Sequence, residues 1–146
     1  YLNEHENYDV NIIVFLRPTS PIRKHGEIDA VVTMLNENIS ADCVRTTRPV
    51  IYPPYWMKKI NNIGYLEPYH SHINPYVFTR RQDLPKVVMC DGSVEAARVD
   101  SIIKYGEFPP GKKLAYYRDN VPFIDIDTPE EWEFCEYYMQ KNKRVI

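Results

Sequence analysis

Two carboxylates near the carboxyl terminus are the side chains with the most direct chemical use. Asp125 and Asp127 are separated by one residue and follow an apolar approach that contains Val121, Phe123 and Ile124. Side chains two positions apart in an extended segment point the same way, so both carboxylates face one side. Hard oxygen ligands at this spacing suit Mg²⁺ beside a phosphate. The same residues allow a second interpretation, in which one Asp caps the next helix, because a helix N-terminus favours negative charge.

A second polar group follows the most apolar run of the chain, residues 11–16. The string LRPTSPIR places two arginines and two hydroxyls there, namely Arg17, Thr19, Ser20 and Arg23. Ligands of open α/β sheets bind beyond the carboxyl ends of strands, and arginine binds carboxylates and phosphates bidentately. The string predicts either an anion-binding loop or a proline-stiffened connection with solvated arginines.

A third polar group is the string RRQDLP, which begins with Arg80, Arg81, Gln82 and Asp83. Adjacent arginines followed by an amide and a carboxylate either recognise an anion or form a surface ion-pair cluster. From these residues alone, the surface cluster is the favoured interpretation.

The apolar pattern around these groups predicts an α/β scaffold. Residues 11–16 form a continuous apolar run typical of a strand buried on both faces, in the middle of a parallel sheet. Ile28, Val31, Val32 and Leu35 then recur at helical spacing, after prolines that end the strand. Further along, residues 42–47, 86–89 and 113–117 are strand-like, and residues 99–105 form a short helix.

The last helix has the clearest signal in the chain. Thr128 and Glu131 form a predicted capping box, with Pro129 at the first helical position. The helix is expected to continue to about Lys143. Its apolar face consists of Trp132, Cys135, Tyr138 and Met139.

Residues 48–85 differ in composition and periodicity from the rest of the chain and predict an inserted lobe. This region contains six prolines and little periodicity, which fits edge strands and loops. Its aromatic residues make either a protein interface or the small core of the lobe itself. They are Tyr52, Tyr55, Trp56, Tyr65, Tyr69 and Tyr76.

Composition bounds the class of protein. A chain of 146 residues that is 44% hydrophobic predicts one domain, residues 1–146. The net charge of −2 and the lack of a basic block argue against a nucleic-acid partner, and no apolar run is long enough for a membrane span. Three widely spaced cysteines, Cys43, Cys90 and Cys135, give no disulfide framework, so a reducing cytoplasm is expected.

One enzyme class is excluded by the order of the residues. Asp125-Ile126-Asp127-Thr128 resembles the first motif of haloacid-dehalogenase-type phosphatases, in which further essential groups come later in the chain. Only one predicted helix follows Thr128, so that interpretation fails.

Taken in order, the three polar strings resemble motifs of the acylneuraminate cytidylyltransferase (CMP-sialic acid synthetase) family. LRPTSPIR resembles the family's LQPTSPLR, RRQDLP matches its RRQDLP, and FIDIDTPEEWEFCE is similar to its ending. PPYWMKK also resembles the start of the family's dimerisation lobe, so the likeness covers essentially the whole chain. It implies a partial nucleotide-diphospho-sugar-transferase-like (Rossmann-like) α/β fold with a mixed sheet. It also implies a homodimer formed through the lobe at about residues 48–85.

The resemblance implies roles for particular residues. Asp125 and Asp127 would be catalytic and would hold the Mg²⁺ that bridges the phosphates of CTP. Arg80 or Arg81 would pair with the carboxylate of a sugar acid, with Gln82 beside them, and Phe108 would lie against the acyl group. Arg17, Thr19, Ser20, Arg23 and Glu95 complete the implied substrate-binding set.

Two departures from the family motifs bear on the sugar. Arg17 replaces the family's Gln, and Glu95 stands where the family's Asn-Gly-Ala-Ile-Tyr string has its Tyr. These two side chains are expected either to pair with each other or to read a differently substituted sugar. The expected acceptor is therefore a nonulosonic acid other than N-acetylneuraminic acid.

The family's glycine- and lysine-containing phosphate loop has no counterpart in the sequence, which holds neither GxGxxG nor GK[ST]. The chain also begins at Tyr1 without an initiator Met, so it is expected to be the carboxyl-terminal part of a longer protein and not to turn over CTP alone. The competing hypothesis, from another functional class, is a non-catalytic remnant that dimerises or binds an acidic sugar.

Overall fold

The computed structural model describes residues 5, 6, 8–70 and 80–142. The chain is divided into two compact units. The first unit consists of Tyr1–Arg48 together with Cys90–Ile146, and the second is Pro49–Met89.

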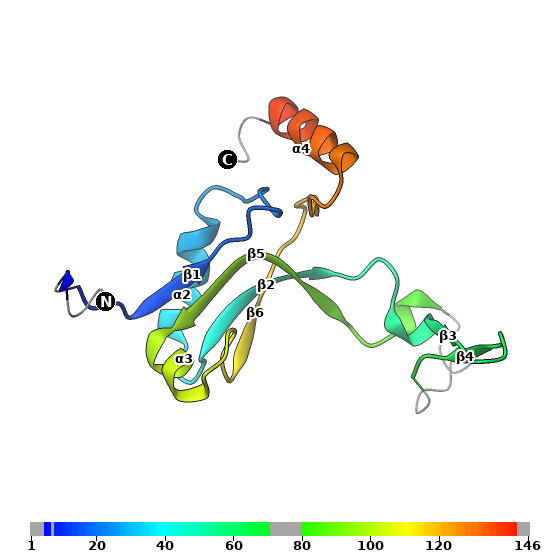
Figure 1. The fold of residues 1–146 in the computed structure, drawn as a ribbon, viewed down its shortest axis with the longest axis horizontal. Helices are drawn as coiled ribbons and strands as arrows, with labels where there is room; N and C mark the ends of the chain where they lie inside the picture. Colours follow the sequence, from blue (N-terminus) through cyan, green and yellow to red (C-terminus); the bar gives the residue numbers. More distant parts are fainter. Residues whose placement is uncertain (1–4, 7, 71–79, 143–146) are drawn as a thin grey trace. The chain divides into compact units, whose positions relative to one another are not determined.

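A four-stranded sheet forms the centre of the first unit, in the order β1-β5-β2-β6 (Figure 1). The strands are β1 (Ile12–Phe15), β2 (Cys43–Pro49), β5 (Val88–Arg98) and β6 (Lys113–Tyr117). β2 and β6 run parallel, and β1 runs antiparallel to β5. The sheet is therefore mixed, as the expected fold class requires.

The direction of β5 places the strand ends that carry the candidate loops together. The amide of Arg98 donates to the carbonyl of Asp42, and the amide of Val94 donates to the hydroxyl of Thr46. Moving forward along β2 thus means moving backward along β5, so β5 is antiparallel to β2. β1, β2 and β6 consequently share a direction, and their carboxyl ends lie at one edge of the sheet.

The predicted position of β1 in the middle of a parallel sheet is wrong. Within the sheet formed by the described residues, β1 is an edge strand, and its neighbour β5 runs antiparallel to it. Ile12 and Val14 pack against the core, whereas Ile13 and Phe15 are exposed. This alternation is not visible in the sequence, because five consecutive residues are apolar. Both faces of the strand are therefore apolar, but only one of them is covered by the core.

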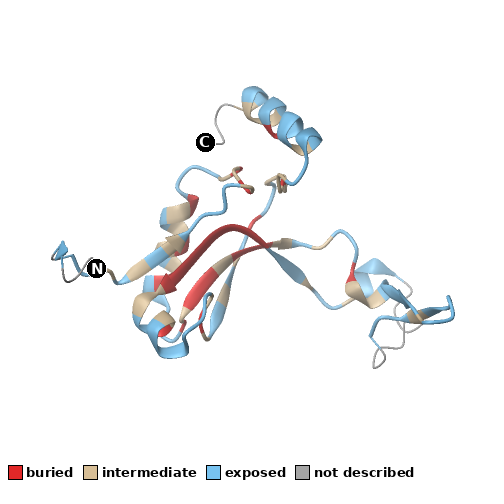
Figure 2. Cartoon of the chain, viewed as in Figure 1, coloured by how far each residue is buried: buried red, intermediate tan, exposed pale blue. Residues whose placement is uncertain are grey.

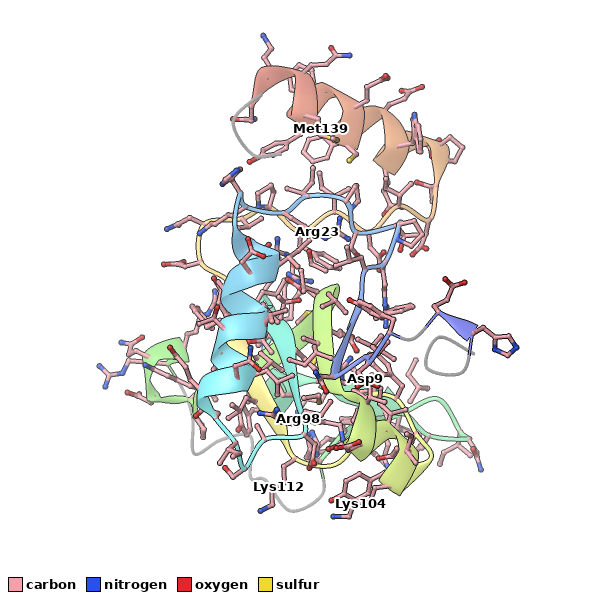
Figure 3. All side chains as sticks on the ribbon, turned by 90° about the vertical axis from the view of Figure 1, so that its left-hand side faces the viewer. Asp9, Arg23, Arg98, Lys104, Lys112 and Met139 are labelled. Carbon is pink, nitrogen blue, oxygen red and sulfur yellow. The ribbon has the colours of Figure 1, made fainter. Side chains whose placement is uncertain are left out.

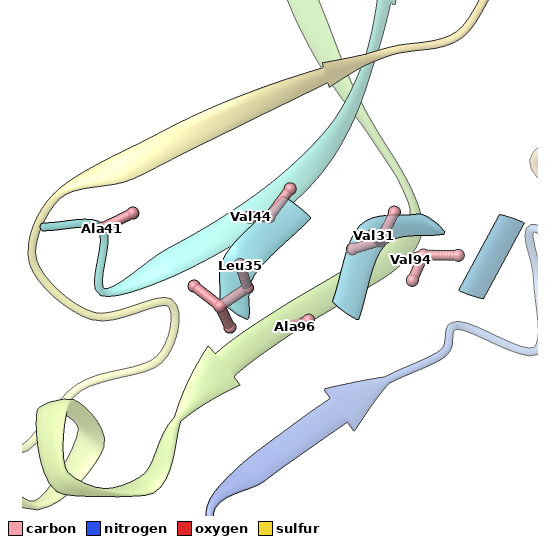
Figure 4. Packing of buried hydrophobic residues seen from close by; sticks show 6 residues of the cluster. All are labelled: Val31, Leu35, Ala41, Val44, Val94 and Ala96. Atoms are coloured by element: carbon pink, nitrogen blue, oxygen red, sulfur yellow. The ribbon is translucent and has the colours of Figure 1, made fainter. Parts of the chain in front are cut away.

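The main core lies between the sheet and helix α2 (Glu27–Glu37). Val31 and Leu35 of α2 pack against Val44, Val94 and Ala96 of the sheet (Figure 4), and these strand segments form the buried band in Figure 2. The helical spacing predicted from residues 28–35 is confirmed. Burying each such aliphatic side chain is worth about 1.5–3 kcal/mol.

Helices α3 (Val99–Tyr105) and α4 (Pro129–Lys141) confirm the predicted helical segments. The capping box is present, because the hydroxyl of Thr128 accepts from the amide of Glu131 and the Glu131 carboxylate accepts from the amide of Thr128. A second small core joins α4 to the loops through Ile22, Ile124 and Cys135. Trp132, predicted to lie on the apolar face, is largely exposed.

The second unit contains the short strands β3 (Lys58–Ile60) and β4 (Leu66–Pro68), which pair antiparallel, and the 3-10 turns η1 (Pro54–Trp56) and η2 (Arg81–Asp83). Among its described residues, most of the large apolar side chains are exposed, including Tyr52 at 77% and Leu66 at 70%. Tyr76, one of the predicted interface residues, lies outside the described residues. Across the described ranges, none of the helices combines the length and the apolar character of a membrane span.

Candidate functional site

The segment that contains Asp125 and Asp127 leads into the capped helix α4, and its apolar residues alternate with the two carboxylates. Ile124 is buried in the second core and Ile126 packs against it. The amide of Ile126 donates to the carbonyl of Thr19 at 2.8 Å, which ties the segment to the LRPTSPIR loop. Since side chains alternate along an extended segment, the two carboxylates point away from that core.

The environment of these carboxylates fits a hard divalent cation. Oδ1 of Asp125 lies 3.4 Å from the hydroxyl of Ser20, and among the described residues the carboxylate of Asp127 has no hydrogen bond or ion pair. Among the described residues, neither carboxylate therefore forms an ion pair with a cationic side chain. Mg²⁺ is commonly held by one or two carboxylates with waters and substrate phosphates, so two carboxylates that form no ion pair match its donor set.

The alternative role of these carboxylates, capping α4, does not occur among the described residues. The Thr128 hydroxyl and the Glu131 carboxylate supply the cap, and Glu131 also accepts from the amide of Asp127 at 2.9 Å. In the described ranges, no three or more His, Cys, Asp or Glu side chains form a group that could hold a metal ion.

An apolar pocket of about 600 Å³ lies between α4 and the loop, on the other side of this segment. Neither Asp125 nor Asp127 lines it. Its lining residues are Pro18, Pro21, Ile126, Trp132, Cys135, Glu136, Met139 and Gln140.

Both arginines of the loop lie against backbone (Figure 3 labels Arg23). Arg23 donates to the carbonyls of Ser93 at 3.0 Å and Arg17 at 2.9 Å. Burial, together with the nearby charge of Arg118, lowers the pKa of Arg23. The Arg17 side chain lies so close to Gly92 that a Cβ there would meet its Cδ and Nε at 2.8 Å. Both arginines thus shape the loop, and anion binding by them stays a prediction.

Glu95 forms an ion pair with Arg45 of β2, and not with Arg17 as one of the expected alternatives proposed. The carboxylate of Glu95 lies 2.7 Å from the guanidinium of Arg45, and its side chain is 4% exposed. β1 to β5 pairing places Glu95 opposite Phe15 on the sheet. The reason for the difference is that Arg45 lies on the neighbouring strand of the sheet, whereas the side chain of Arg17 turns toward Gly92.

The remaining candidates are distributed over both units. The ring of Phe108 packs edge-on against Phe15 at 5.8 Å and is exposed. Arg80 pairs with Asp83 at 3.0 Å, and Arg81 donates to the carbonyl of Val50, so the surface cluster expected from RRQDLP forms within the second unit. Participation of Arg80, Arg81 and Gln82 in a site with residues of the first unit stays a prediction.

A buried ionic cluster lies behind the loop and was not identified from the sequence. Arg118, directly after β6, donates to both carboxylate oxygens of Glu27 at 2.8 and 3.0 Å and to Asp91 at 2.6 Å. Its side chain is 4% exposed, and those of Glu27 and Asp91 are 1% exposed. A fourth bond goes to the carbonyl of Ile22. The only signal in the sequence is a charged residue immediately after a strand, which alone predicts nothing.

Asp91 makes the stability of this cluster dependent on pH. Burial disfavours its charged form, but hydrogen bonds from Arg118, from the Thr46 hydroxyl and from the Ser93 amide outweigh burial and lower the pKa of Asp91. The folded state then binds fewer protons than the unfolded state. Stability is fully present above the unfolded pKa of about 3.9 and is lost as the pH falls through the lower folded value.

We therefore expect the free energy of unfolding to fall as the pH drops below about 4, and to fall less steeply in Asp91→Asn. Denaturant unfolding over a pH series measures both slopes. Asp42→Asn is the comparison, because hydrogen bonds from Ser101 and from the Lys112 amide also lower the pKa of Asp42, at a half-buried site outside this cluster. An Asp91→Asn variant with the parent's acid slope would contradict the assignment.

The mixed sheet, with its loops at the carboxyl ends of β1, β2 and β6, has a nucleotidyltransferase fold. Its backbone is similar to the structure of CMP:2-keto-3-deoxy-manno-octonic acid synthetase complexed with CTP, with a TM-score of 0.59 at 12% identity. That match covers 97% of this chain and 66% of the other. The expected fold class is thereby confirmed.

Sequence comparison gives a second likeness. The chain is 28% identical over 142 residues to CMP-N,N'-diacetyllegionaminic acid synthase of Legionella pneumophila subsp. pneumophila, a match that covers 92% of this chain and 56% of the relative. The chain thus spans about half the length of that relative. No protein-family model matches it. Both likenesses are to synthetases of CMP-sugar acids, in agreement with the resemblance of the three motifs to the CMP-sialic acid synthetase family.

Proposed function

We propose that the chain supplies the sugar-acid and divalent-metal side of a site that transfers CMP from CTP to a nonulosonic acid. The observation that carries the proposal is the position of Asp125 and Asp127. Both project from a segment tied to the Thr19 and Ser20 loop, at the sheet edge where α/β proteins bind ligands. The comparison proteins, whose names describe CMP-sugar-acid synthetases, support the same reaction class.

In this proposal, Asp125 and Asp127 hold Mg²⁺ and face the phosphates of CTP. A bound Mg²⁺ would supply charge neutralisation on the transferring phosphoryl group. The part played by the chain itself is positioning. The Ile126 amide between the two carboxylates donates to Thr19, and the Asp127 amide donates to the Glu131 carboxylate. The backbone that carries both carboxylates is therefore held before substrate arrives.

Two kinds of side chain are proposed to hold the sugar acid. Arg80 or Arg81 would pair with its carboxylate, and Gln82 would lie beside them, since arginine binds carboxylates in a planar, bidentate manner. Phe108, exposed and packed on Phe15, would contact the acyl group.

The substrate class is proposed to be a nonulosonic acid other than N-acetylneuraminic acid. Glu95 is buried and neutralised by Arg45, so the more exposed Arg45, at 21%, is the member of this ion pair that a ligand could reach. Arg17 remains exposed next to Gly92. The family motifs have Gln and Tyr at positions 17 and 95. An acceptor with extra polar substituents would fit Arg17 and the Arg45–Glu95 ion pair better than a sugar that is recognised by Gln and Tyr.

Calorimetry separates this proposal from the competing one, in which the chain is a non-catalytic module that dimerises or binds an acidic sugar. We expect saturable heat on adding a diacetylated nonulosonic acid and weaker heat with N-acetylneuraminic acid. Equal binding of the two acids would contradict the proposed substrate class. Heat from sugar acids but none from Mg²⁺ or CTP·Mg²⁺ would favour the non-catalytic module. We also expect no CMP transfer by this chain alone, because the sequence contains neither GxGxxG nor GK[ST].

The second unit is proposed to form a homodimer, in a protein of the cytoplasm. Most of its described large apolar side chains are exposed, which is unusual for a surface that stays in water. We expect sedimentation to show a dimer for the parent chain and a monomer for the double variant Ile60→Ser with Leu66→Ser, whose residues pair across β3 and β4. Ile103→Ser, on α3 and equally exposed at 75%, is the matched control and should remain dimeric. A monomeric parent chain would contradict the proposal.

A further inference from the structure

We propose that Arg118 is a positioning residue for the candidate metal carboxylate Asp125. The inference rests on the proposed function for the role of Asp125 as a metal ligand. The contacts that connect Arg118 to Asp125 do not depend on that role. Arg118 itself is buried and cannot touch a substrate from its place in the fold.

The first step of the argument is that Arg118 connects separate segments at one point. It binds Glu27, the first residue of α2, with two hydrogen bonds, and it binds Asp91 of β5 with a third. Its fourth bond, 2.7 Å to the carbonyl of Ile22, reaches the loop itself. One planar guanidinium thus fixes the end of the loop relative to the helix and the sheet.

The second step leads from this cluster to the carboxylate. The carbonyl of Asp91 lies 3.4 Å from the hydroxyl of Ser20, and the same hydroxyl lies 3.4 Å from Oδ1 of Asp125. A hydroxyl has a single proton, so Ser20 donates to one of these acceptors at a time. The residue next to Ser20, Thr19, accepts from the amide of Ile126. Arg118 therefore binds Ile22, two residues after Ser20 in the loop, and Asp91, whose carbonyl lies near the Ser20 hydroxyl. Thr19 and Ser20 in turn contact Ile126 and Asp125.

The third step excludes a purely local explanation. Arg23 also shapes the loop, but its bonds to Ser93 and Arg17 leave the Ile22 carbonyl and the side chain of Asp91 to Arg118. A lysine at position 118 would keep the positive charge but could not bind Glu27 at two points while also reaching Asp91 and Ile22. The geometry, and not the charge alone, is what the position requires.

Amide hydrogen exchange in Arg118→Lys tests the inference without using activity. We expect exchange of the Ile126 amide, which is bonded to Thr19, to become about tenfold faster. The Arg98 amide, bonded to Asp42 at the far end of the sheet, is the internal control and should keep its rate. In parallel, we expect Mn²⁺ to bind the variant about tenfold more weakly than the parent chain.

A second variant keeps the test decisive if the lysine chain does not fold. In Arg118→Met combined with Glu27→Gln and Asp91→Asn, no buried carboxylate is left unpaired, and the same selective acceleration at Ile126 is expected. Unchanged exchange at Ile126 in a folded variant overturns the inference, and so does equal acceleration at Ile126 and Arg98, which would indicate a general structural role. If the parent chain binds no Mn²⁺, the proposed function fails while the exchange result still decides the role of Arg118.

Discussion

Replacing Arg118 with methionine is expected to lower the free energy of unfolding by about 3–5 kcal/mol, as found when one partner of a buried ion pair is removed. The substitution leaves the carboxylates of Glu27 and Asp91 without their cation, and both side chains are 1% exposed. Each must then either stay charged without compensation or take up a proton. Urea unfolding monitored by circular dichroism measures the change.

Arg80→Met is the matched control for this experiment. Arg80 also forms an arginine–carboxylate pair, 3.0 Å from Asp83, but its side chain is 68% exposed. Exposed pairs contribute about 0–1 kcal/mol, so the control should unfold almost as the parent chain does. Similar losses for the two variants would contradict the account, because burial would then not be the reason that Arg118 matters.

The second large effect is expected at the candidate metal carboxylates. The double variant Asp125→Asn with Asp127→Asn keeps the size and shape of both side chains but removes their charge. We expect Mn²⁺ or Mg²⁺ affinity to fall at least about tenfold, equivalent to about 1.4 kcal/mol. Because neither carboxylate takes part in a buried ion pair, the thermal unfolding of the variant should stay close to that of the parent chain.

The control for the double variant removes the same charge from the helix that follows. Glu130→Gln with Glu133→Gln changes two exposed carboxylates on the first turns of α4. Metal affinity should be unaffected there. An equal loss in both double variants would mean that the cation is attracted by the acidic surface as a whole.

Local signals in the sequence predicted the helices and most strands. Helical spacing at Val31 and Leu35 gave α2, and the Thr128–Glu131 pair gave the start of α4, because both depend on residues close in sequence. The length of β5 was missed. Asp91-Gly92-Ser93 is typical of a turn, yet the strand continues through it with Gly92 at φ +69, since the side chain of Asp91 is satisfied by Arg118 and Thr46.

Long-range pairing explains what the sequence could not provide at the site. The strings around Thr19, Ser20, Asp125 and Asp127 were identified by residue type, and the structure joins them through the Ile126–Thr19 bond. The Arg118 cluster joins residues as far as 91 positions apart. Nothing in the spacing of such residues marks them as partners. Glu95 shows the same limit, because its partner Arg45 is 50 positions away.

The most direct test of the account is a map of Mn²⁺-induced line broadening over the backbone amides of the chain. Mn²⁺ is suitable because it prefers the same carboxylate and water ligands as Mg²⁺. The account predicts that broadening is centred on Asp125–Asp127 and on Ser20, and that it disappears in Asp125→Asn with Asp127→Asn. Broadening centred on Glu130 and Glu133, or none at any amide, would contradict the claim that this segment holds the metal.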